Sequence, residues 1–200
     1  FLPMGIVDAI NTLVQLPSLL KLKKGLRPRP LEEKDCLGAQ VERNARLYGR
    51  SNAITFENRS VNWMEFNALS NQFAYAFKNQ DLKAGDTASV FMENRIEFLA
   101  TVIALNKLGV TAALINTNLS GKPLTHCISV TKSKKCIFGE EKSESLSEVK
   151  CELDLKDSED FFFVKDRQES SPPNWAIDVS EIANSQKTEN PSDTQNRTLG

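Results

Sequence analysis

Three short apolar runs decide the fold: TASVF at residues 87–91, VTAALI at residues 110–115 and KCIF at residues 135–138. The segment between the first two runs, from Asn94 to about Leu108, is apolar over most of its girth and predicts a buried helix. Between the second and third runs, Pro123 falls in the first turn of another helix. Right-handed crossovers lay strands connected in this way parallel. The stretch therefore predicts an α/β fold with a mostly parallel sheet and flanking helices.

Two details make this prediction more specific. Asn94 suits the N-cap of the first helix, and Gly109 stands where a glycine commonly ends a helix. The run at 110–115 is almost continuously apolar, so we expect that strand to be covered on both faces of the sheet. Sheets of this kind bind ligands beyond the carboxyl ends of their strands, where the loops 92–95 and 116–121 lie.

The preceding residues predict a helix, a hairpin and a second helix. One helical face of the first helix is shared by Leu37, Val41, Ala45 and Tyr48. Two short β-type runs then flank Asn58-Arg59, which predicts a tight hairpin turn. Asn62 followed by Glu65 resembles a capping box, so we expect a helix to begin there. That helix continues with an apolar stripe of Phe66, Leu69, Phe73 and Phe77.

After residue 140 the pattern weakens. Residues 160–165 predict a strand and residues 175–182 a short helix, whereas residues 184–199 are polar. We therefore divide the chain into an amphipathic basic segment (1–30), an α/β body (31–183) and a polar linker (184–200).

Length and composition exclude several classes of protein. The 200 residues are 40% hydrophobic and 26% charged, which excludes a disordered chain, a collagen-like chain and a polytopic membrane protein. A net charge of −1 gives no strong field for nucleic acid, and we expect no nucleic-acid partner. The chain starts at Phe1 without an initiator Met and ends in a polar tail at Gly200. We interpret it as part of something longer.

The near-neutral total hides a segregation of charge. Residues 1–30 carry five basic side chains against one acidic, residues 31–139 carry 13 against 10, and residues 140–200 carry 7 against 15. The basic first segment also has an apolar helical face, made of Ile6, Ile10, Leu13 and Val14, before Pro17 interrupts it. It is too short and polar to span a bilayer, but it suits the surface of an anionic membrane. The alternative is a helix packed on the protein's own body.

Candidate catalytic residues are few. His126 is the only histidine, and we interpret it as a structural or surface residue because no nucleophile partner stands at a suggestive spacing. Arg95 follows a strand and could meet a phosphate or carboxylate, although pairing with Glu93 or Glu97 is the simpler interpretation. The adjacent acidic pairs 140–141 and 159–160 are interpreted as solvated carboxylates.

Two other site classes find little support. The four cysteines are Cys36, Cys127, Cys136 and Cys151. None forms a C-x-x-C pair, so we expect reduced cytosolic thiols rather than a zinc site or a disulfide framework. The pair Gly121-Lys122 is followed by Pro123 where a P-loop has Ser or Thr, and no glycine stands five residues before it. The P-loop type of phosphate cradle is therefore missing.

Several stretches together resemble a known family. Residues 53–74, AITFENRSVNWMEFNALSNQFA, are similar to the first core motif of the AMP-forming, adenylate-forming ligases, and residues 105–119, LNKLGVTAALINTNL, to their second. Three stretches resemble one branch of this family, the fatty-acid transport proteins, also called very-long-chain acyl-CoA synthetases. They are residues 93–99 (ENRIEFL), 113–119 (ALINTNL) and 124–127 (LTHC). The resemblance covers about residues 31–140.

This resemblance implies a fold and an activity. The fold would be an incomplete N-terminal subdomain of the adenylate-forming ligases. The reaction would join a long-chain fatty acid to ATP as an acyl-adenylate with release of pyrophosphate, and coenzyme A would then displace AMP. Mg²⁺ would offset phosphate charge in the first step. A cytoplasmic place at the inner face of a membrane would suit such a substrate and the basic first segment.

The chain lacks the motifs by which the family catalyses. Its Ser/Thr/Gly-rich phosphate loop, its ribose-binding acidic residue and its C-terminal lysine have no counterpart among residues 1–200. We therefore assign no catalytic, cofactor-binding or metal-binding residue and expect the N-terminal fragment of a longer ligase, inactive alone. The alternatives are a non-catalytic lipid-binding or membrane-docking module and a different ligase, such as a carnitine or bile-acid CoA ligase.

Overall fold

The computed structural model describes residues 17–18, 36–166 and 170–192. The chain separates into two units, residues 1–33 and residues 34–200. Of the predicted amphipathic segment, only Pro17 and Ser18 fall among the described residues, where both are helical. The rest of that segment lies outside the described residues. The second unit contains the sheet and the other described helices.

A five-stranded parallel sheet forms the centre of this unit. Its strands are β3 (Thr87–Phe91), β4 (Thr111–Leu114), β5 (Lys135–Gly139), β6 (Phe161–Val164) and β7 (Ile177–Asp178). Their spatial order is β4-β3-β5-β6-β7, and every neighbouring pair is parallel. The predicted parallel α/β fold is therefore confirmed.

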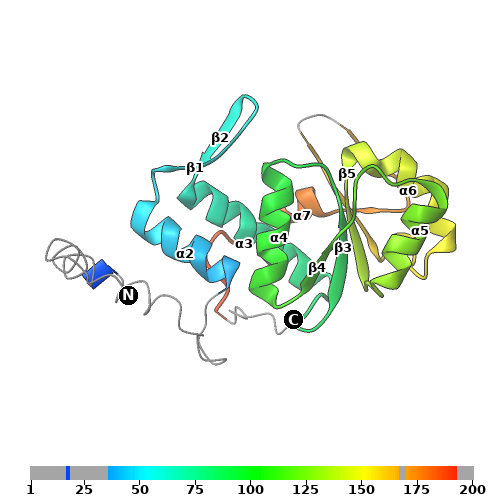
Figure 1. The fold of residues 1–200 in the computed structure, drawn as a ribbon, viewed down its shortest axis with the longest axis horizontal. Helices are drawn as coiled ribbons and strands as arrows, with labels where there is room; N and C mark the ends of the chain where they lie inside the picture. Colours follow the sequence, from blue (N-terminus) through cyan, green and yellow to red (C-terminus); the bar gives the residue numbers. More distant parts are fainter. Residues whose placement is uncertain (1–16, 19–35, 167–169, 193–200) are drawn as a thin grey trace, which may run out of the picture. The chain divides into compact units, whose positions relative to one another are not determined.

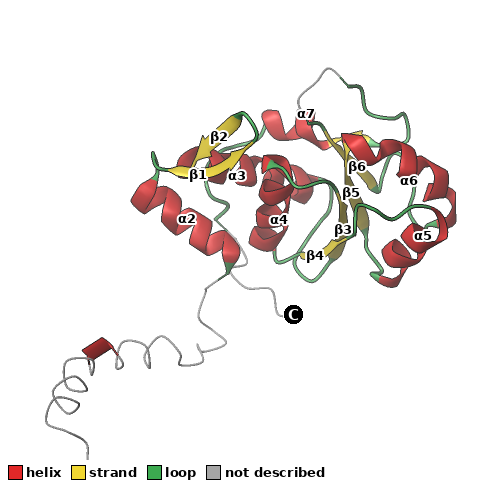
Figure 2. Cartoon of the chain, turned by 45° about the horizontal axis from the view of Figure 1, so that its top comes forward, coloured by secondary structure: helices red, strands yellow, loops and turns green. Residues whose placement is uncertain are grey.

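Helices cover both faces of the sheet. On one face lie α3 (Trp63–Asn79), α4 (Ile96–Leu108) and α7 (Val179–Asn184), and on the other lie α5 (Gly121–Val130) and α6 (Ser143–Val149). Figures 1 and 2 show the two groups of helices on opposite sides of the strands. Two short 3₁₀ turns, η1 (Glu140–Lys142) and η2 (Lys150–Glu152), flank α6.

Alternating side chains divide the interior into two cores. In β5 and β6, Ile137 and Phe162 join the core under α3 and α4, whereas Phe138 and Phe163 join the core under α5 and α6. Both strands are buried along their whole length, as expected of inner strands in a parallel sheet. Ring packing marks each core, because the centroid of Phe162 lies 6.1 Å from that of Phe77 on one face. On the other face, Phe138 stacks on Trp175 at 5.1 Å.

The prediction that the apolar run at 110–115 is covered on both faces is wrong. The strand in this run, β4, is an edge strand with β3 as its partner, and Thr111 and Leu114 at its two ends are exposed. Apolar composition reports the hydrophobicity of a strand but not its place in the strand order. Gly109 does end the preceding helix as predicted, with a φ of 72° in the left-handed region.

The predicted capping box forms at the start of α3. The Glu65 backbone N–H donates to Asn62 Oδ1 at 2.9 Å, and the Asn62 backbone N–H donates to Glu65 Oε2 at 2.8 Å. Before it come α2 (Leu37–Tyr48) and the antiparallel hairpin of β1 (Asn52–Phe56) and β2 (Arg59–Asn62). The hairpin turn is Glu57-Asn58, one residue earlier than predicted, because Arg59 already pairs with Phe56 in the ladder.

Two local predictions are corrected by the structure. Arg95, not Asn94, is the N-cap of α4, and it makes no side-chain capping bond. The predicted helix at 175–182 is instead the short strand β7 followed by α7, because Ile177 and Asp178 pair with β6. Asp178 then caps α7 by accepting the Glu181 backbone N–H at 3.0 Å.

A buried lysine joins the helices α2, α3 and α4. Lys107 in the last turn of α4 is fully buried, and its ammonium donates to Glu42 at 2.9 Å, Asn67 at 2.8 Å and Asn71 at 2.6 Å. These three acceptors use all three of its N–H donors. Burial lowers the pKa of Lys107, although the hydrogen bond and the charge of Glu42 oppose this. At Gly38, an added Cβ would lie 2.7 Å from Lys107 Cγ, so α2 needs a glycine to approach this side chain.

Replacing Lys107 should destabilise the fold. In Lys107→Met, the Glu42 carboxylate and two amide oxygens lose a donor at a buried site, and we expect a loss of about 2–4 kcal/mol in the free energy of unfolding. Urea unfolding followed by circular dichroism measures this loss. Lys122→Met, at an exposed position on α5, is the control and should change the value by less than about 0.5 kcal/mol. Equal values for the two variants would contradict the assigned role of Lys107.

Candidate functional site at the carboxyl edge of the sheet

The loops at the carboxyl ends of the strands form the candidate site. They are residues 92–95 after β3, 115–120 after β4, 140–142 after β5 and 165–166 after β6. Because all five strands are parallel, these loops emerge at one edge of the sheet, where α/β proteins bind ligands. The two loops singled out in the sequence, 92–95 and 116–121, do lie there.

Arg95 is the buried centre of this edge. Its side chain is 5% exposed, and its guanidinium bonds to the Glu141 carboxylate and donates to the Val164 carbonyl at 2.9 Å. Glu97 and Asp166 add carboxylates whose oxygens lie 3.7 and 4.0 Å from its Nε atom. The predicted pairing with Glu97 is confirmed and the one with Glu93 is not. Two of its three nitrogen atoms donate to internal partners, so its observed role is to join the ends of β3, β5 and β6.

Of the four carboxylates predicted to be solvated, Glu159 is solvated, with a side chain that is 63% exposed, and the other three are engaged. Glu141 bonds to Arg95 and accepts the Glu93 backbone N–H at 2.7 Å, while Glu140 accepts the Asp166 backbone N–H at 3.0 Å. Asp160 lies 2.8 Å from the Lys135 ammonium. Burial alone would raise the pKa of Asp160, but hydrogen bonds from Lys135 and the Lys156 backbone outweigh it and lower that pKa. Four of these partners lie 25 to 48 positions away along the chain, so no local pattern in the sequence reveals them.

A second ion pair ties the outer part of the edge together. Lys142 bonds to the Glu93 carboxylate and donates to the Thr117 carbonyl at 3.1 Å, and the Thr117 hydroxyl donates to Glu93 Oε2 at 3.2 Å. The hydrogen bond from Lys142 is the main cause that lowers the pKa of Glu93. The three side chains belong to the loops after β3, β4 and β5. Sequence reasoning missed this triad because no local motif places the three residues together.

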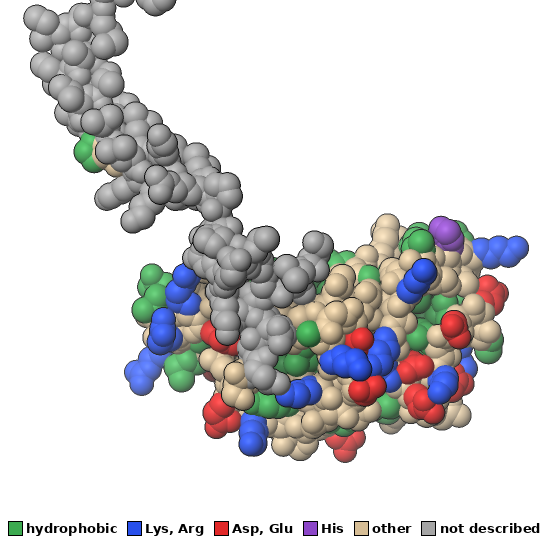
Figure 3. All heavy atoms as spheres, turned by 90° about the horizontal axis from the view of Figure 1, so that it is seen from below, with side chains coloured by type: hydrophobic (Ala, Val, Ile, Leu, Met, Phe, Trp, Pro, Cys, Tyr) green, Lys and Arg blue, Asp and Glu red, His purple; other side chains and the backbone are tan. Residues whose placement is uncertain are grey.

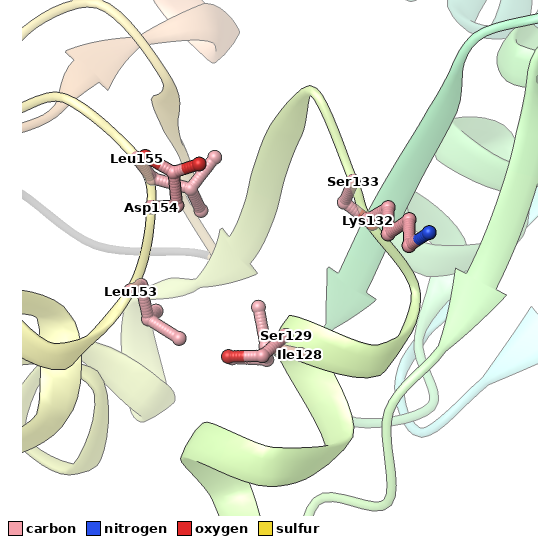
Figure 4. Close-up of a pocket in the computed structure, with 7 residues that line it drawn as sticks. All are labelled: Ile128, Ser129, Lys132, Ser133, Leu153, Asp154 and Leu155. Carbon is pink, nitrogen blue, oxygen red and sulfur yellow. The ribbon is translucent and has the colours of Figure 1, made fainter.

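Two hollows differ in position and character. One of about 180 Å³ lies at the carboxyl edge between the loops after β3 and β4, and Met92, Phe98, Ile115 and Asn116 are among its walls. A larger one of about 400 Å³ lies between the end of α5 and the segment after η2 (Figure 4). Its walls include Ile128, Leu153 and Leu155, and the Lys132 ammonium points away from it in Figure 4. The hollow at the carboxyl edge is therefore the one placed for chemistry.

Neither histidine nor cysteine, two common nucleophiles and bases, lies in the loops of this edge. His126 lies exposed on α5, which confirms the interpretation as a surface residue. All four cysteines fall among the described residues as free thiols. Cys136 is fully buried in β5, and this burial raises the pKa of its thiol to about 12, far from the range of a reactive cysteine.

The part of the chain that the structure describes offers neither a metal cluster nor a membrane span. No group of three or more His, Cys, Asp or Glu side chains there could hold a metal ion. No helix in the described ranges is both long and apolar enough to cross a bilayer.

A comparison with protein families decides the identity of this fold. The family of AMP-binding enzymes matches residues 41–197, which make up most of the chain. The chain belongs to the AMP-binding enzyme family. Residues matched in this way include the whole parallel sheet, the carboxyl edge and the Arg95 centre. The resemblance drawn from residues 53–74 and 105–119 is thereby confirmed.

Individual AMP-binding relatives agree with the suggested branch. Long-chain fatty acid transport protein 1 of mouse is 30% identical over 155 residues, which are 76% of this chain and 24% of that protein. The same protein of cattle is 37% identical over 89 residues, 44% of this chain and 14% of that one. The chain thus spans a quarter or less of the length of these curated relatives.

Solved structures support the fold. An anthranilate CoA ligase in complex with anthranoyl-AMP superimposes with a TM-score of 0.68 at 17% identity, over 76% of this chain and 28% of that one. A long-chain-fatty-acid-CoA ligase from Archaeoglobus fulgidus gives a TM-score of 0.67 at 19% identity, over 81% and 32%. At these identities the likeness concerns the fold alone, which is that of an N-terminal part of an adenylate-forming ligase.

Removing the Arg95 guanidinium should damage the whole edge. In Arg95→Met, the Glu141 carboxylate loses its counter-ion and Glu97 keeps only Arg59, and we expect the free energy of unfolding to fall by about 3 kcal/mol. The control is Arg50→Met, an exposed arginine, which should stay within about 0.5 kcal/mol of the unchanged chain. Chemical denaturation of the chain measures both. A loss no larger than that of the control would show that Arg95 is dispensable.

The Glu93 carboxyl provides a pH-dependent test. We expect its pKa to lie below 4.5 in the folded chain and to rise toward that value in Lys142→Gln. Because the folded-state pKa is lowered, the interaction stabilises the fold above the unfolded pKa and is lost as the pH falls through the folded one. A carbon-detected NMR titration of Glu93 measures this pKa. Lys156→Gln, which removes the ammonium paired with Glu159, should leave it unchanged.

Proposed function

We propose that the chain is the N-terminal part of the AMP-binding domain of a long- or very-long-chain fatty acyl-CoA synthetase. The enzyme would convert ATP, a fatty acid and coenzyme A into acyl-CoA, AMP and pyrophosphate. The observation that supports this most strongly is the 30% identity to a long-chain fatty acid transport protein over 155 residues, which are 76% of this chain. Residues 31–183 would form this part of the domain, and residues 184–200 would connect it to the phosphate-binding part of the enzyme.

In this proposal the chain contributes architecture. Arg95, Glu141 and the Glu93–Lys142 pair fix the loops at the carboxyl edge, and the hollow beside Met92 and Asn116 would face the reactants. These charged groups already bond to one another, so they hold loops in place without taking up a phosphate. We keep the prediction that this chain alone carries no catalytic residue.

The proposed cofactors are ATP, Mg²⁺ and coenzyme A. A structural relative holds an acyl-adenylate, anthranoyl-AMP, which supports ATP as the activating nucleotide in this family. In the described part of this chain no cluster of carboxylates is suited to Mg²⁺. The described residues therefore do not fit a magnesium site, and we derive no reaction step from one. The fatty acid is proposed because the curated relatives are named for long-chain fatty acids, and coenzyme A because the structural relatives are named CoA ligases.

The proposed location is the cytoplasmic face of a membrane. Long acyl chains partition into bilayers, so an enzyme that consumes them benefits from a place at the lipid surface. The basic segment of residues 1–30 supports such a location by its sequence, because five basic side chains follow or flank an apolar helical face.

Pyrophosphate exchange tests the proposed activity. A protein encoded by the open reading frame around these residues should show fatty-acid-dependent exchange between ATP and labelled pyrophosphate, and palmitate is a suitable first substrate. The 200-residue chain alone, as the matched control, should show none. Exchange by the chain alone would overturn its architectural role. Absence of exchange with any fatty acid, together with exchange with a bile acid or carnitine, would favour the alternative ligases.

A further inference from the structure

The outer face of α2 combines exposed apolar and basic side chains in one place. Arg43, Arg46, Leu47 and Arg50 follow the spacing i, i+3, i+4, i+7, which brings them to one side of the helix and its end. The neighbouring Tyr48 and, at the start of α3, Met64 extend this surface. We call these six residues the α2 corner.

The apolar members of the α2 corner are exposed although α2 itself is firmly packed. Leu47, Tyr48 and Met64 are 58%, 56% and 58% exposed, far above the values of the core residues. The opposite face of α2 is anchored through Gly38 and Val41, which are buried. The α2 corner is therefore exposed while the helix that carries it is packed in the fold.

Met64 is held beside the end of α2. Its backbone N–H donates to the Gly49 carbonyl at 3.0 Å, and a Cβ added to Gly49 would lie 2.7 Å from Met64 Cγ. Gly49 thus permits a close approach of Met64 to the end of α2. The result places exposed Met64 of α3 beside the end of α2, where Leu47 and Tyr48 are also exposed.

The charges of the α2 corner are basic and uncompensated. Arg46 and Arg50 have no ion pair or hydrogen bond among the described residues, and the Arg43 guanidinium bonds to the neutral Gln40 side chain. The carboxylates next to Arg43 and Met64 in the sequence have other partners, because Glu42 pairs with Lys107 and Glu65 closes the capping box of α3. Figure 3 shows green and blue side chains gathered at the end of the body that α2 forms.

We propose that the α2 corner docks on the surface of an anionic lipid bilayer. Apolar side chains flanked by arginines match the boundary between acyl chains and negatively charged headgroups. Arginine stems can lie along the acyl region while their guanidinium groups reach the headgroups. The proposal concerns the folded body, is separate from the basic segment of residues 1–30, and does not depend on the ligase reaction.

Vesicle flotation with the full chain tests this proposal. Vesicles of phosphatidylcholine with one-third phosphatidylserine should bind the chain, and vesicles of phosphatidylcholine alone should bind it weakly. A basic residue near such a surface is worth roughly fivefold in affinity, so Arg46→Gln combined with Arg50→Gln should weaken binding on the order of 25-fold. Leu47→Ser combined with Met64→Ser should weaken it by about tenfold, because less apolar surface leaves water.

Matched controls use exposed residues of the opposite end. Lys122→Gln combined with Lys132→Gln removes the same charge, and Val130→Ser removes an apolar side chain that is 66% exposed. Both controls should bind within about twofold of the unchanged chain, since surface changes away from the contact have little effect. Circular dichroism and the thermal midpoint verify that every variant is folded.

Three results would overturn the proposal. The first is that the unchanged chain does not bind the anionic vesicles, and the second is that both α2-corner variants bind as it does. The third is that the lysine control weakens binding as much as the arginine variant, which would indicate net charge rather than a contact surface. Sedimentation velocity tests whether a second copy of the chain, rather than a membrane, covers this surface. If the unchanged chain self-associates and Leu47→Ser with Met64→Ser abolishes this without an effect on vesicles, the surface is an interface between copies of the chain.

Discussion

The carboxyl edge of the sheet depends on one buried cation, the guanidinium of Arg95. It contacts Glu141 after β5, the carbonyl of Val164 at the end of β6 and Glu97 within α4. Without this cation, Glu141 and Asp166 would lose a nearby positive charge, and Glu97 would keep only Arg59, whose guanidinium lies 2.7 Å from it. The loops that a ligand would meet are thus held by an interaction that is itself unavailable to the ligand. Among the described residues, the charged side chains of this edge thus bond to one another and hold the loops.

The helix α4 connects this edge to the rest of the body, because it has a buried cation at each end. Arg95 stands at its N-terminus, where the helix dipole disfavours positive charge, and the nearby carboxylates offset that cost. Lys107 stands in its last turn, where the dipole favours a cation, and it gathers acceptors from α2 and α3. Asn71, one of these acceptors, also donates to the Thr188 carbonyl at 2.7 Å. A single helix therefore couples the sheet edge, the α2–α3 layer and the segment near residue 188.

The sequence predicts what is local in this structure and misses what is distant. Alternating apolar runs, the glycine at 109 and the Asn62–Glu65 capping box act within a few residues, and all were predicted correctly. The contact of Arg95 with Glu141 spans 46 positions, and no periodicity reveals it. Lys107 was missed because a lysine in a helix is expected on the surface, and burial with three neutral or acidic partners is rare. The edge position of β4 and the strand β7 require knowledge of the strand order, which short sequence patterns do not contain.

Basic and acidic side chains are concentrated at different ends of the folded body. The body places α2 at one end and α6 at the other, as both ribbon views show. The arginines of the α2 corner therefore lie at the opposite end from α6 and its two flanking turns, where residues 140–152 carry five acidic side chains against two basic ones. An anionic surface would attract the first end and repel the second, so even a weak contact would select one orientation of the body. The net charge of −1 conceals this asymmetry, since attraction and repulsion act on different ends of the molecule. A docked body would then stand with α2 against the lipid and its acidic end in the water.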